Sequence, residues 1–151
     1  MAITNAVTLV RPFHGGGQGE IVRMPKAYGF DTGLVSFARG WDPLRPEDLG
    51  LLWEHLVLEH LQALFPDLPV RYWRDRNGRE VDFVLARRRD EMDAVECKWN
   101  PASFEAGGLR AFRRLHPKGR NFLVTPSGVP AFTRDYDGLE VRVCTPSELV
   151  P

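Results

Sequence analysis

Residues 70–99, which read VRYWRDRNGREVDFVLARRRDEMDAVECKW, are the stretch that decides the fold. Their aromatic and β-branched residues predict three strands, over 70–74, 79–86 and 92–99. The Asn77-Gly78 pair predicts a tight turn after the first strand, and the charged run 87–91 predicts the loop before the third. Strands joined by such short links form an antiparallel meander.

The segments on both sides of this meander complete an α/β order. A helical pattern over 49–65, stopped by Pro66, precedes the meander. A second helix over 104–115 and a strand over 121–125 follow it. Residues 132–144 predict one or two more strands, and 146–149 predict a final helical turn. The order helix, three strands, helix, strand is typical of an α/β fold.

The N-terminal part reads as an extension of this core. Residues 6–13 and 20–24 predict a hairpin around the glycine run Gly15-Gly16-Gly17. No Lys-Ser/Thr pair and no helical pattern follow the glycines, so a turn is favoured over a phosphate-binding loop. Residues 28–31 predict a short extended piece and 40–47, with two prolines, a connector. We expect one domain overall, in which the hairpin and connector (1–47) pack on the core (48–151).

Composition narrows the class of protein. The 151 residues are 43% hydrophobic and 26% charged with zero net charge, so the molecule as a whole is not committed electrostatically to nucleic acid. Cys97 and Cys144 have neither CxxC nor zinc spacing, which argues against a disulfide scaffold and suits a reducing compartment. No stretch approaches the length of a membrane span, and the N-terminus lacks a signal-peptide pattern. A cytoplasmic location is therefore expected.

Glu54 is a charged residue on the apolar face of the first helix. Positions 58, 61 and 65 share its face and hold leucine, leucine and phenylalanine. A carboxylate in such a stripe is costly unless a cation or hydrogen-bond donors meet it. Glu54 is therefore a candidate functional residue, and a salt bridge to a nearby arginine is the simpler alternative.

Asp82 and the pair Glu96 and Lys98 lie on neighbouring strands of the meander. Alternation predicts that Glu80, Asp82 and Val84 point to one face, and that Val81, Phe83 and Leu85 point to the other. With a turn near Arg89, Asp82 falls opposite Glu96, with Cβ atoms about 5 Å apart. Such like charges repel, and a divalent cation is the usual remedy. A one-residue slip would separate them. The alternative is an exposed face with ion pairs to Lys98 and an arginine.

Two groups of basic residues are candidates for an anion-binding surface. The first contains Arg110, Arg113, Arg114, Lys118 and Arg120, and the second contains Arg71, Arg74, Arg76 and Arg79. A solvated face explains both groups equally well. If the surface binds nucleic acid, we expect Arg74, Arg110, Arg113 and Arg114 to contact backbone phosphates without sequence preference.

Four strings together resemble a known family: AYGFDTGL (27–34), LWEHLVLEHL (52–61), YWRDRNGREVDFVL (72–85) and AVECKW (94–99). They are similar to the C-terminal domain of many prokaryotic AAA+-type ATPases, a domain thought to be nuclease-like. The arrangement also resembles the PD-(D/E)xK nuclease superfamily, which implies a restriction-endonuclease-like core with Glu54, Asp82, Glu96 and Lys98 as catalytic residues. Val81 replaces the proline that precedes the superfamily's metal-binding aspartate, and this sequence has no ATPase phosphate loop.

The resemblance implies a Mg²⁺-dependent endonuclease, with Mn²⁺ as an alternative ion, that hydrolyses DNA phosphodiesters. Asp82, Glu96 and Glu54 would serve the metal, the Cys97 carbonyl would add a ligand, and Lys98 would stabilise phosphate charge. Expected partners are DNA, an ATPase domain and, as in resolvase-like members of the fold, a second copy. The alternatives are a catalytically silent DNA-docking or regulatory module of an ATPase and a pure protein-interaction domain. The four intact residues favour the enzyme, but the sequence leaves open whether hydrolysis occurs.

Overall fold

The predicted meander forms the centre of the sheet. The computed structural model describes residues 6–15, 24–126 and 130–149. Strands β3 (Val70–Arg74), β4 (Glu80–Arg88) and β5 (Glu91–Cys97) pair antiparallel. From the pair of Phe83 with Val95 to the pair of Ala86 with Met92, β4 and β5 have the register that the sequence predicts. The expected element order, a helix, this meander, a helix and a strand, is present.

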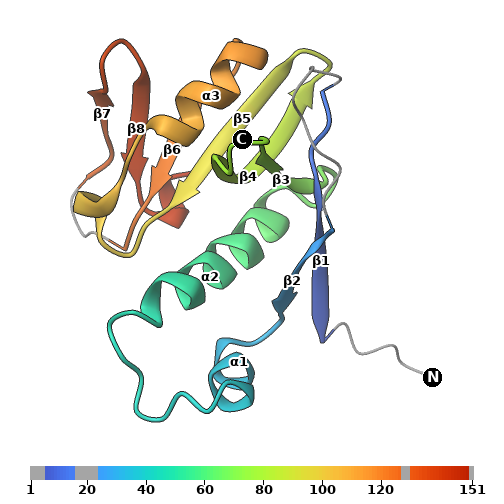
Figure 1. Cartoon of the computed structure of the whole chain (residues 1–151), viewed down its shortest axis with the longest axis vertical. Coiled ribbons are helices and arrows are strands. Elements are labelled where there is room, and N and C mark those ends of the chain that lie inside the picture. The colour runs from blue at the N-terminus through green and yellow to red at the C-terminus, as the bar shows by residue number, and fades with distance from the viewer. Residues whose placement is uncertain (1–5, 16–23, 127–129, 150–151) are drawn as a thin grey trace.

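The described strands form one mixed sheet of eight strands in the order β2-β1-β3-β4-β5-β6-β8-β7 (Figure 1). On one side, β1 (Val7–Pro12) pairs antiparallel with β2 (Lys26–Gly29) and parallel with β3. On the other side, β6 (Asn121–Val124) is parallel to both β5 and β8 (Glu140–Cys144), and β7 (Phe132–Asp135) is antiparallel to β8. The N-terminal hairpin is thus part of the central sheet.

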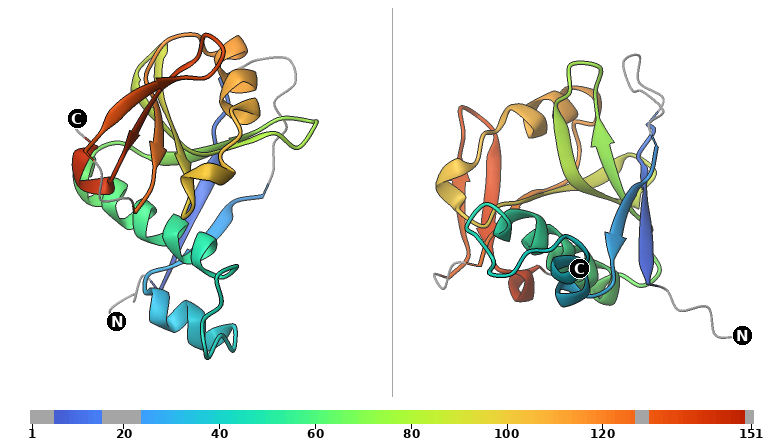
Figure 2. Two further views of the ribbon diagram at one scale, coloured as in Figure 1. Left: turned by 90° about the vertical axis from the view of Figure 1, so that its left-hand side faces the viewer. Right: turned by 60° about the horizontal axis from the view of Figure 1, so that its bottom comes forward.

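Two helices cover opposite faces of this curved sheet (Figure 2). Helix α2 (Leu49–Leu64) buries Val57, Leu58 and Leu61 in one apolar cluster with Phe83 and Val95. Helix α3 (Gly107–Leu115) buries Leu109 and Phe112 in a second cluster with Trp73, Val84 and Leu123. Neighbouring strand residues such as Phe83 and Val84 therefore pack on opposite faces of the sheet, in different apolar clusters. Among the described helices, none is long and apolar enough to cross a membrane.

Three shorter helices connect these elements. Helix α1 (Thr32–Ala38) begins at the cap residue Asp31, whose side chain accepts a hydrogen bond of 2.6 Å from the Leu34 N–H. The 3₁₀ turns η1 (Pro101–Ser103) and η2 (Pro146–Glu148) flank the second half of the sheet. No residue of α1 is buried. This helix is seven residues long, too short for a sustained helical pattern in the sequence, and it was not predicted.

The structure adds to one expectation and corrects another. The described partner of β1 is Lys26–Gly29, whereas residues 20–23 of the predicted strand over 20–24 lie outside the described ranges. The expected alternation of β4 breaks: Val81 packs in the cluster of α3, whereas Phe83 packs in that of α2. The register between β3 and β4 shifts at this point, so two residues of β4 face Tyr72 alone. This is a β-bulge, and Asp82 is one of its two residues.

Candidate active site

The bulge in β4 sets the direction of Asp82. The Cys97 N–H at the end of β5 donates to Asp82 Oδ2 at 2.8 Å. This contact turns the carboxylate toward the gap between β4 and β5, within electrostatic reach of Glu54 on α2. Bulges commonly redirect a side chain next to functional sites. A local irregularity therefore places Asp82 between the sheet and α2.

Asp82, Glu96 and Lys98 lie together at this end of the sheet. Lys98 Nζ is 3.4 Å from Glu96 Oε2 and 4.0 Å from Asp82 Oδ2. Burial, with repulsion from Glu54, raises the pKa of Asp82 to about 6. Burial and then the charge of Asp82 raise the pKa of Glu96 well above its usual range. Burial alone would lower the pKa of Lys98, but the two carboxylates outweigh it and raise that pKa.

Glu54 reaches the same region from α2. Its side chain is 23% exposed, and Oε1 accepts hydrogen bonds from the Tyr28 hydroxyl and, at 3.4 Å, from Lys26 Nζ. The salt bridge that the sequence offered as the simpler explanation is thus present, with a lysine of β2 as the partner instead of an arginine. The predicted position on the buried stripe holds as well, since Leu58, Leu61 and Phe65 are all buried.

Three residues of this site were not predicted from the sequence: Lys26, Tyr28 and Glu80. Lys26 Nζ contacts Glu80 Oε1 as well as Glu54. Arg74 Nε lies 3.1 Å from Glu80 Oε2, an ion pair without hydrogen-bond geometry. Lys26 and Tyr28 share a face of β2 because they are two positions apart. That spacing was visible, but it points to the site only once β2 is known to pair with β1.

The charges of the site are unevenly matched. Among the described residues, Glu54 and Glu80 form ion pairs with two cations, Lys26 and Arg74, whereas the ion pairs of Asp82 and Glu96 are both with Lys98. The deficit of positive charge therefore falls on the two carboxylates whose pKa is raised. A divalent cation that takes oxygen ligands would relieve this repulsion, and the Cys97 carbonyl oxygen would be a further ligand of the same kind.

The arrangement fits one such ion better than a three-carboxylate site. Within residues 6–15, 24–126 and 130–149, no group of three or more His, Cys, Asp or Glu side chains is placed to hold a metal ion. Glu54 already accepts hydrogen bonds from Tyr28 and Lys26. The donor chemistry of Asp82 and Glu96 suits a single ion, and Glu54 does not fit as a third direct ligand in this arrangement.

Helix α3 closes the site from the other side. A Cβ atom on Gly108 would lie 2.1 Å from the Glu80 carbonyl oxygen and 3.3 Å from Glu96 Oε1. Glycine at this position therefore lets α3 approach the start of β4 closely. The side chain of Glu96 is packed between its own strand and the beginning of this helix.

We expect Gly108→Ala to destabilise the fold by about 1–3 kcal/mol, because the added methyl group forces α3 away from β4. Gly107→Ala is the matched control, since a Cβ there meets nothing within 4 Å. Urea denaturation of both variants measures the difference in unfolding free energy. Equal stability of the two variants would contradict the close approach.

The family of this chain follows from a match over residues 49–141. That span fits the model of a family described as a domain of unknown function, DUF4143, and is more than half of the chain. The chain belongs to the DUF4143 family. The matched span contains Glu54, Asp82, Glu96 and Lys98, whereas Lys26 lies before it.

Two curated relatives share part of this DUF4143 chain. The uncharacterized proteins Rv2008c of Mycobacterium tuberculosis and Mb2031c of Mycobacterium bovis are each 42% identical over 87 residues. The match covers 55% of this chain but only 18% of each relative. The solved assembly of Thermococcus gammatolerans McrB AAA+ hexamers with bound McrC is 17% identical, with a TM-score of 0.44. The matched region is 64% of this chain and 28% of the chain in that assembly. A likeness this weak supports no conclusion about function.

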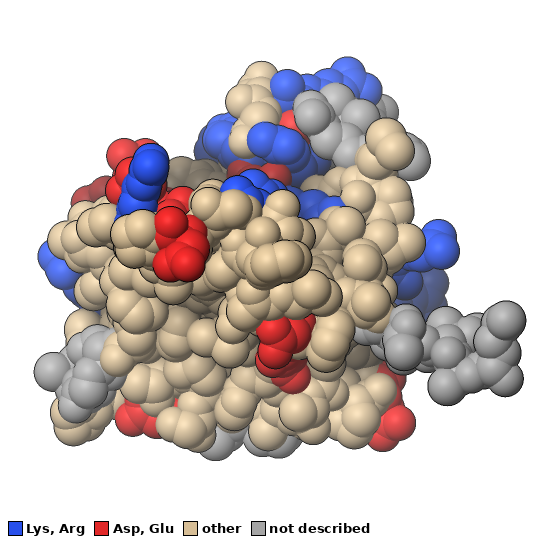
Figure 3. Space-filling view, turned by 90° about the horizontal axis from the view of Figure 1, so that it is seen from below, with Lys and Arg blue, Asp and Glu red and all other residues tan. Residues whose placement is uncertain are grey.

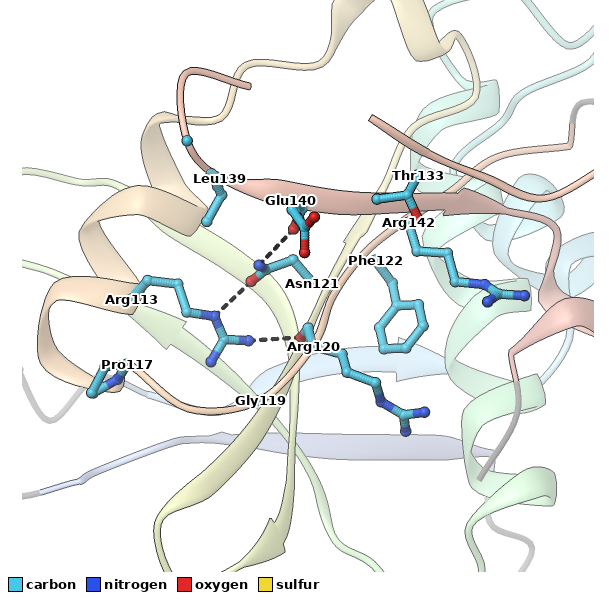
Figure 4. A pocket seen from close by; sticks show the side chains of 11 residues that line it. Arg113, Pro117, Gly119, Arg120, Asn121, Phe122, Thr133, Leu139, Glu140 and Arg142 are labelled. Atoms are coloured by element: carbon cyan, nitrogen blue, oxygen red, sulfur yellow. Dashed lines mark hydrogen bonds between the residues drawn. The ribbon is translucent and has the colours of Figure 1, made fainter. Parts of the chain in front are cut away.

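The arginines predicted to bind nucleic acid lie in different settings in this DUF4143 chain. Arg113 donates to Asn121 Oδ1 and to the carbonyl oxygens of His116, Lys118 and Arg120. Figure 4 shows the bonds to Asn121 and Arg120, which lie beside a hollow of about 490 Å³. Burial lowers the pKa of Arg113 to about 10. This network disfavours Arg113 as a phosphate contact, because its donors already hold the chain after α3.

The other three arginines stay candidates. Arg74 pairs with Glu80 beside the site. Arg110 donates to the Tyr136 carbonyl oxygen at 2.8 Å and to Asp137. Arg114 is exposed and lines a hollow of about 350 Å³ together with Arg76 and Arg79. That hollow includes residues of the turn that leads into Glu80.

Proposed function

We propose that this chain is a metal-dependent nuclease-like domain that hydrolyses DNA phosphodiesters. The observation that carries the proposal is the gathering of Glu54, Asp82, Glu96 and Lys98 from α2, β4 and the end of β5, with positive charge in deficit at Asp82 and Glu96. Two helices on opposite faces of a central meander support a restriction-endonuclease-like core. Two neighbouring carboxylates with raised pKa values, here the partly buried Asp82 and the buried Glu96, are typical of functional sites.

The proposed chemistry assigns a task to each residue. Asp82, Glu96 and the Cys97 carbonyl would hold one Mg²⁺ or Mn²⁺ ion. Such an ion neutralises phosphate charge and activates water when it is bound. Lys98 stabilises the negative charge that develops on the scissile phosphate. Glu54, held by Tyr28 and Lys26, orients the attacking water by accepting a hydrogen bond from it.

Surface charge suggests how DNA would approach. Figure 3 shows a broad face of mostly uncharged residues, with lysine and arginine gathered toward one edge. Arg76, Arg79 and Arg114 line one hollow and would contact backbone phosphates without reading sequence. DNA binding should therefore be local to this hollow, in keeping with a net charge of zero.

Exposed apolar residues in the N-terminal part suggest a protein partner. Val7, Leu9, Phe30 and Phe37 are exposed, and Phe37 on α1 is 84% accessible. Surfaces of this kind commonly mark protein contacts. The similarity of the sequence to ATPase-linked domains makes an ATPase domain, in the cytoplasm, the proposed partner. A homodimer is the other arrangement that we expect.

A catalytically silent DNA-docking or regulatory module is the second candidate function. The observation that favours it is that Lys98 already meets Asp82 and Glu96, the carboxylates that would serve a metal ion. In such a module the same charges would stabilise the fold. DNA would then bind at the arginine-lined hollow without being cut.

The deciding experiment incubates the protein with Mg²⁺ or Mn²⁺ and linear, branched and single-stranded DNA. We expect cleavage that needs the metal and that falls by about 10²-fold or more in Lys98→Ala. Arg88→Ala is the control, because the exposed Arg88 pairs with Glu91 at the turn between β4 and β5, away from the site. Cleavage that persists in Lys98→Ala would show a different site or a contaminant. Binding to DNA with no cleavage of any substrate would favour the silent module.

A further inference from the structure

Lys26 holds the position between Glu54 and Glu80. Its Nζ is 3.4 Å from Glu54 Oε1 and also contacts Glu80 Oε1. The side chains of Lys26, Glu54 and Glu80 are 27%, 23% and 22% exposed, so all three are largely withdrawn from water. The ammonium group also lies 5.3 Å from the centre of the Tyr72 ring. Lys26 is therefore packed into the site and does not extend freely into solvent.

The positive charge of Lys26 compensates the negative charges of Glu54 and Glu80, as a divalent metal ion at that position would. A carboxylate that is partly removed from water needs a cation or donors nearby. An ammonium group is a compact point charge with three donors, so it can meet two carboxylates at once. Burial alone would lower the pKa of Lys26, but attraction to Glu54, Glu80 and Asp82 raises that pKa. The group is charged at neutral pH.

We propose that Lys26 is a resident cation of the site, whose ammonium group occupies the position of a second divalent ion between Glu54 and Glu80. The part of this inference that concerns the first ion, at Asp82 and Glu96, rests on the proposed function. Strand β2, outside the span that matches the family, supplies the lysine, whereas Glu54 and Glu80 lie inside that span. The N-terminal hairpin thereby limits the site to one ion.

Titration calorimetry of the full chain with Mn²⁺ tests the inference. We expect one ion per wild-type chain and two per Lys26→Met chain, because the methionine removes the charge and keeps most of the side-chain volume. Lys118→Met is the matched control and should bind one ion. Two ions in the wild type, or the same number in Lys26→Met as in the wild type, would overturn the inference.

The same titrations separate this inference from the proposed function. If the wild type binds no ion and Lys26→Met binds one, the resident cation stands and the proposed metal site fails. If both proteins bind one ion, the metal site stands and the resident cation fails. Without metal, Lys26→Met should melt at a lower temperature than the wild type, and Mn²⁺ should restore it. If that variant does not fold, Lys26→Gln, which keeps hydrogen-bond donors without charge, carries the same expectation of two ions.

Discussion

Asp82→Asn is expected to slow metal-dependent DNA cleavage strongly and at the same time to stabilise the metal-free protein. We expect cleavage to fall by about 10²–10³-fold, which is the effect of removing one preorganised electrostatic group from other enzymes. Asparagine has nearly the same shape and can still accept the hydrogen bond of the Cys97 N–H. The substitution therefore removes the charge and leaves the local geometry in place.

The gain in stability follows from the pKa of Asp82. Burial, followed by repulsion from Glu54, raises that pKa from 3.8 to about 6. The unfolded chain releases this proton first as the pH rises, so ionisation destabilises the folded state. The penalty is absent below pH 3.8, grows toward pH 6 and is complete above it. Each pKa unit corresponds to about 1.4 kcal/mol, and with Glu96 sharing the repulsion we expect a gain of about 1–3 kcal/mol at neutral pH.

Urea denaturation in EDTA at pH 7 and pH 4, together with a cleavage assay, measures both effects. The stability advantage of Asp82→Asn should shrink or vanish at pH 4. Asp90→Asn is the control, because Asp90 is an exposed carboxylate on the neighbouring loop. An Asp82→Asn protein that is less stable than the wild type at pH 7 would mean that the charge contributes to folding instead of opposing it.

The central meander could be predicted because each of its signals is local. Alternating apolar residues and the Asn77-Gly78 turn predict β3 and β4, and the charged loop near Arg89 sets the register of β4 against β5. Glu54 was found for a similar reason, since its apolar neighbours lie within three turns of the same helix. Both inferences use only residues close together in sequence.

The features that escaped prediction depend on contacts between distant segments. Strand β2 is four residues long, and only its pairing with β1 and the sheet brings Lys26 to Glu54, which is 28 positions away. The bulge at Asp82 lies in a stretch, Glu80 to Phe83, in which charged and apolar residues alternate. Its cause is the fit of β4 against β3 and the Cys97 N–H, which no local pattern encodes. The sequence therefore identified the charged residues, and the structure shows which of them share a cation.

Asp93→Ala is expected to cause the largest loss of stability, about 3 kcal/mol. Asp93 on β5 is 2% exposed. Its carboxylate accepts hydrogen bonds from the Arg120 main-chain N–H at 3.0 Å and from Arg120 Nη2 at 2.7 Å. Arg87 Nε lies 3.7 Å away. Removal of the carboxylate leaves one N–H and two guanidinium groups without their anion at the junction of β5 and β6.

The size of this effect depends on how far the arginines can turn to water. The Arg120 side chain is 43% exposed and can rotate outward, whereas Arg87 is 19% exposed and cannot do so as easily. We therefore expect a loss at the lower end of the range for broken buried ion pairs. Asp93→Asn keeps an acceptor for the Arg120 N–H and should lose less than Asp93→Ala. Chemical denaturation of both variants at pH 7 measures their unfolding free energies. If Asp93→Ala is as stable as the wild type, the contact between Asp93 and Arg120 does not hold β5 to β6.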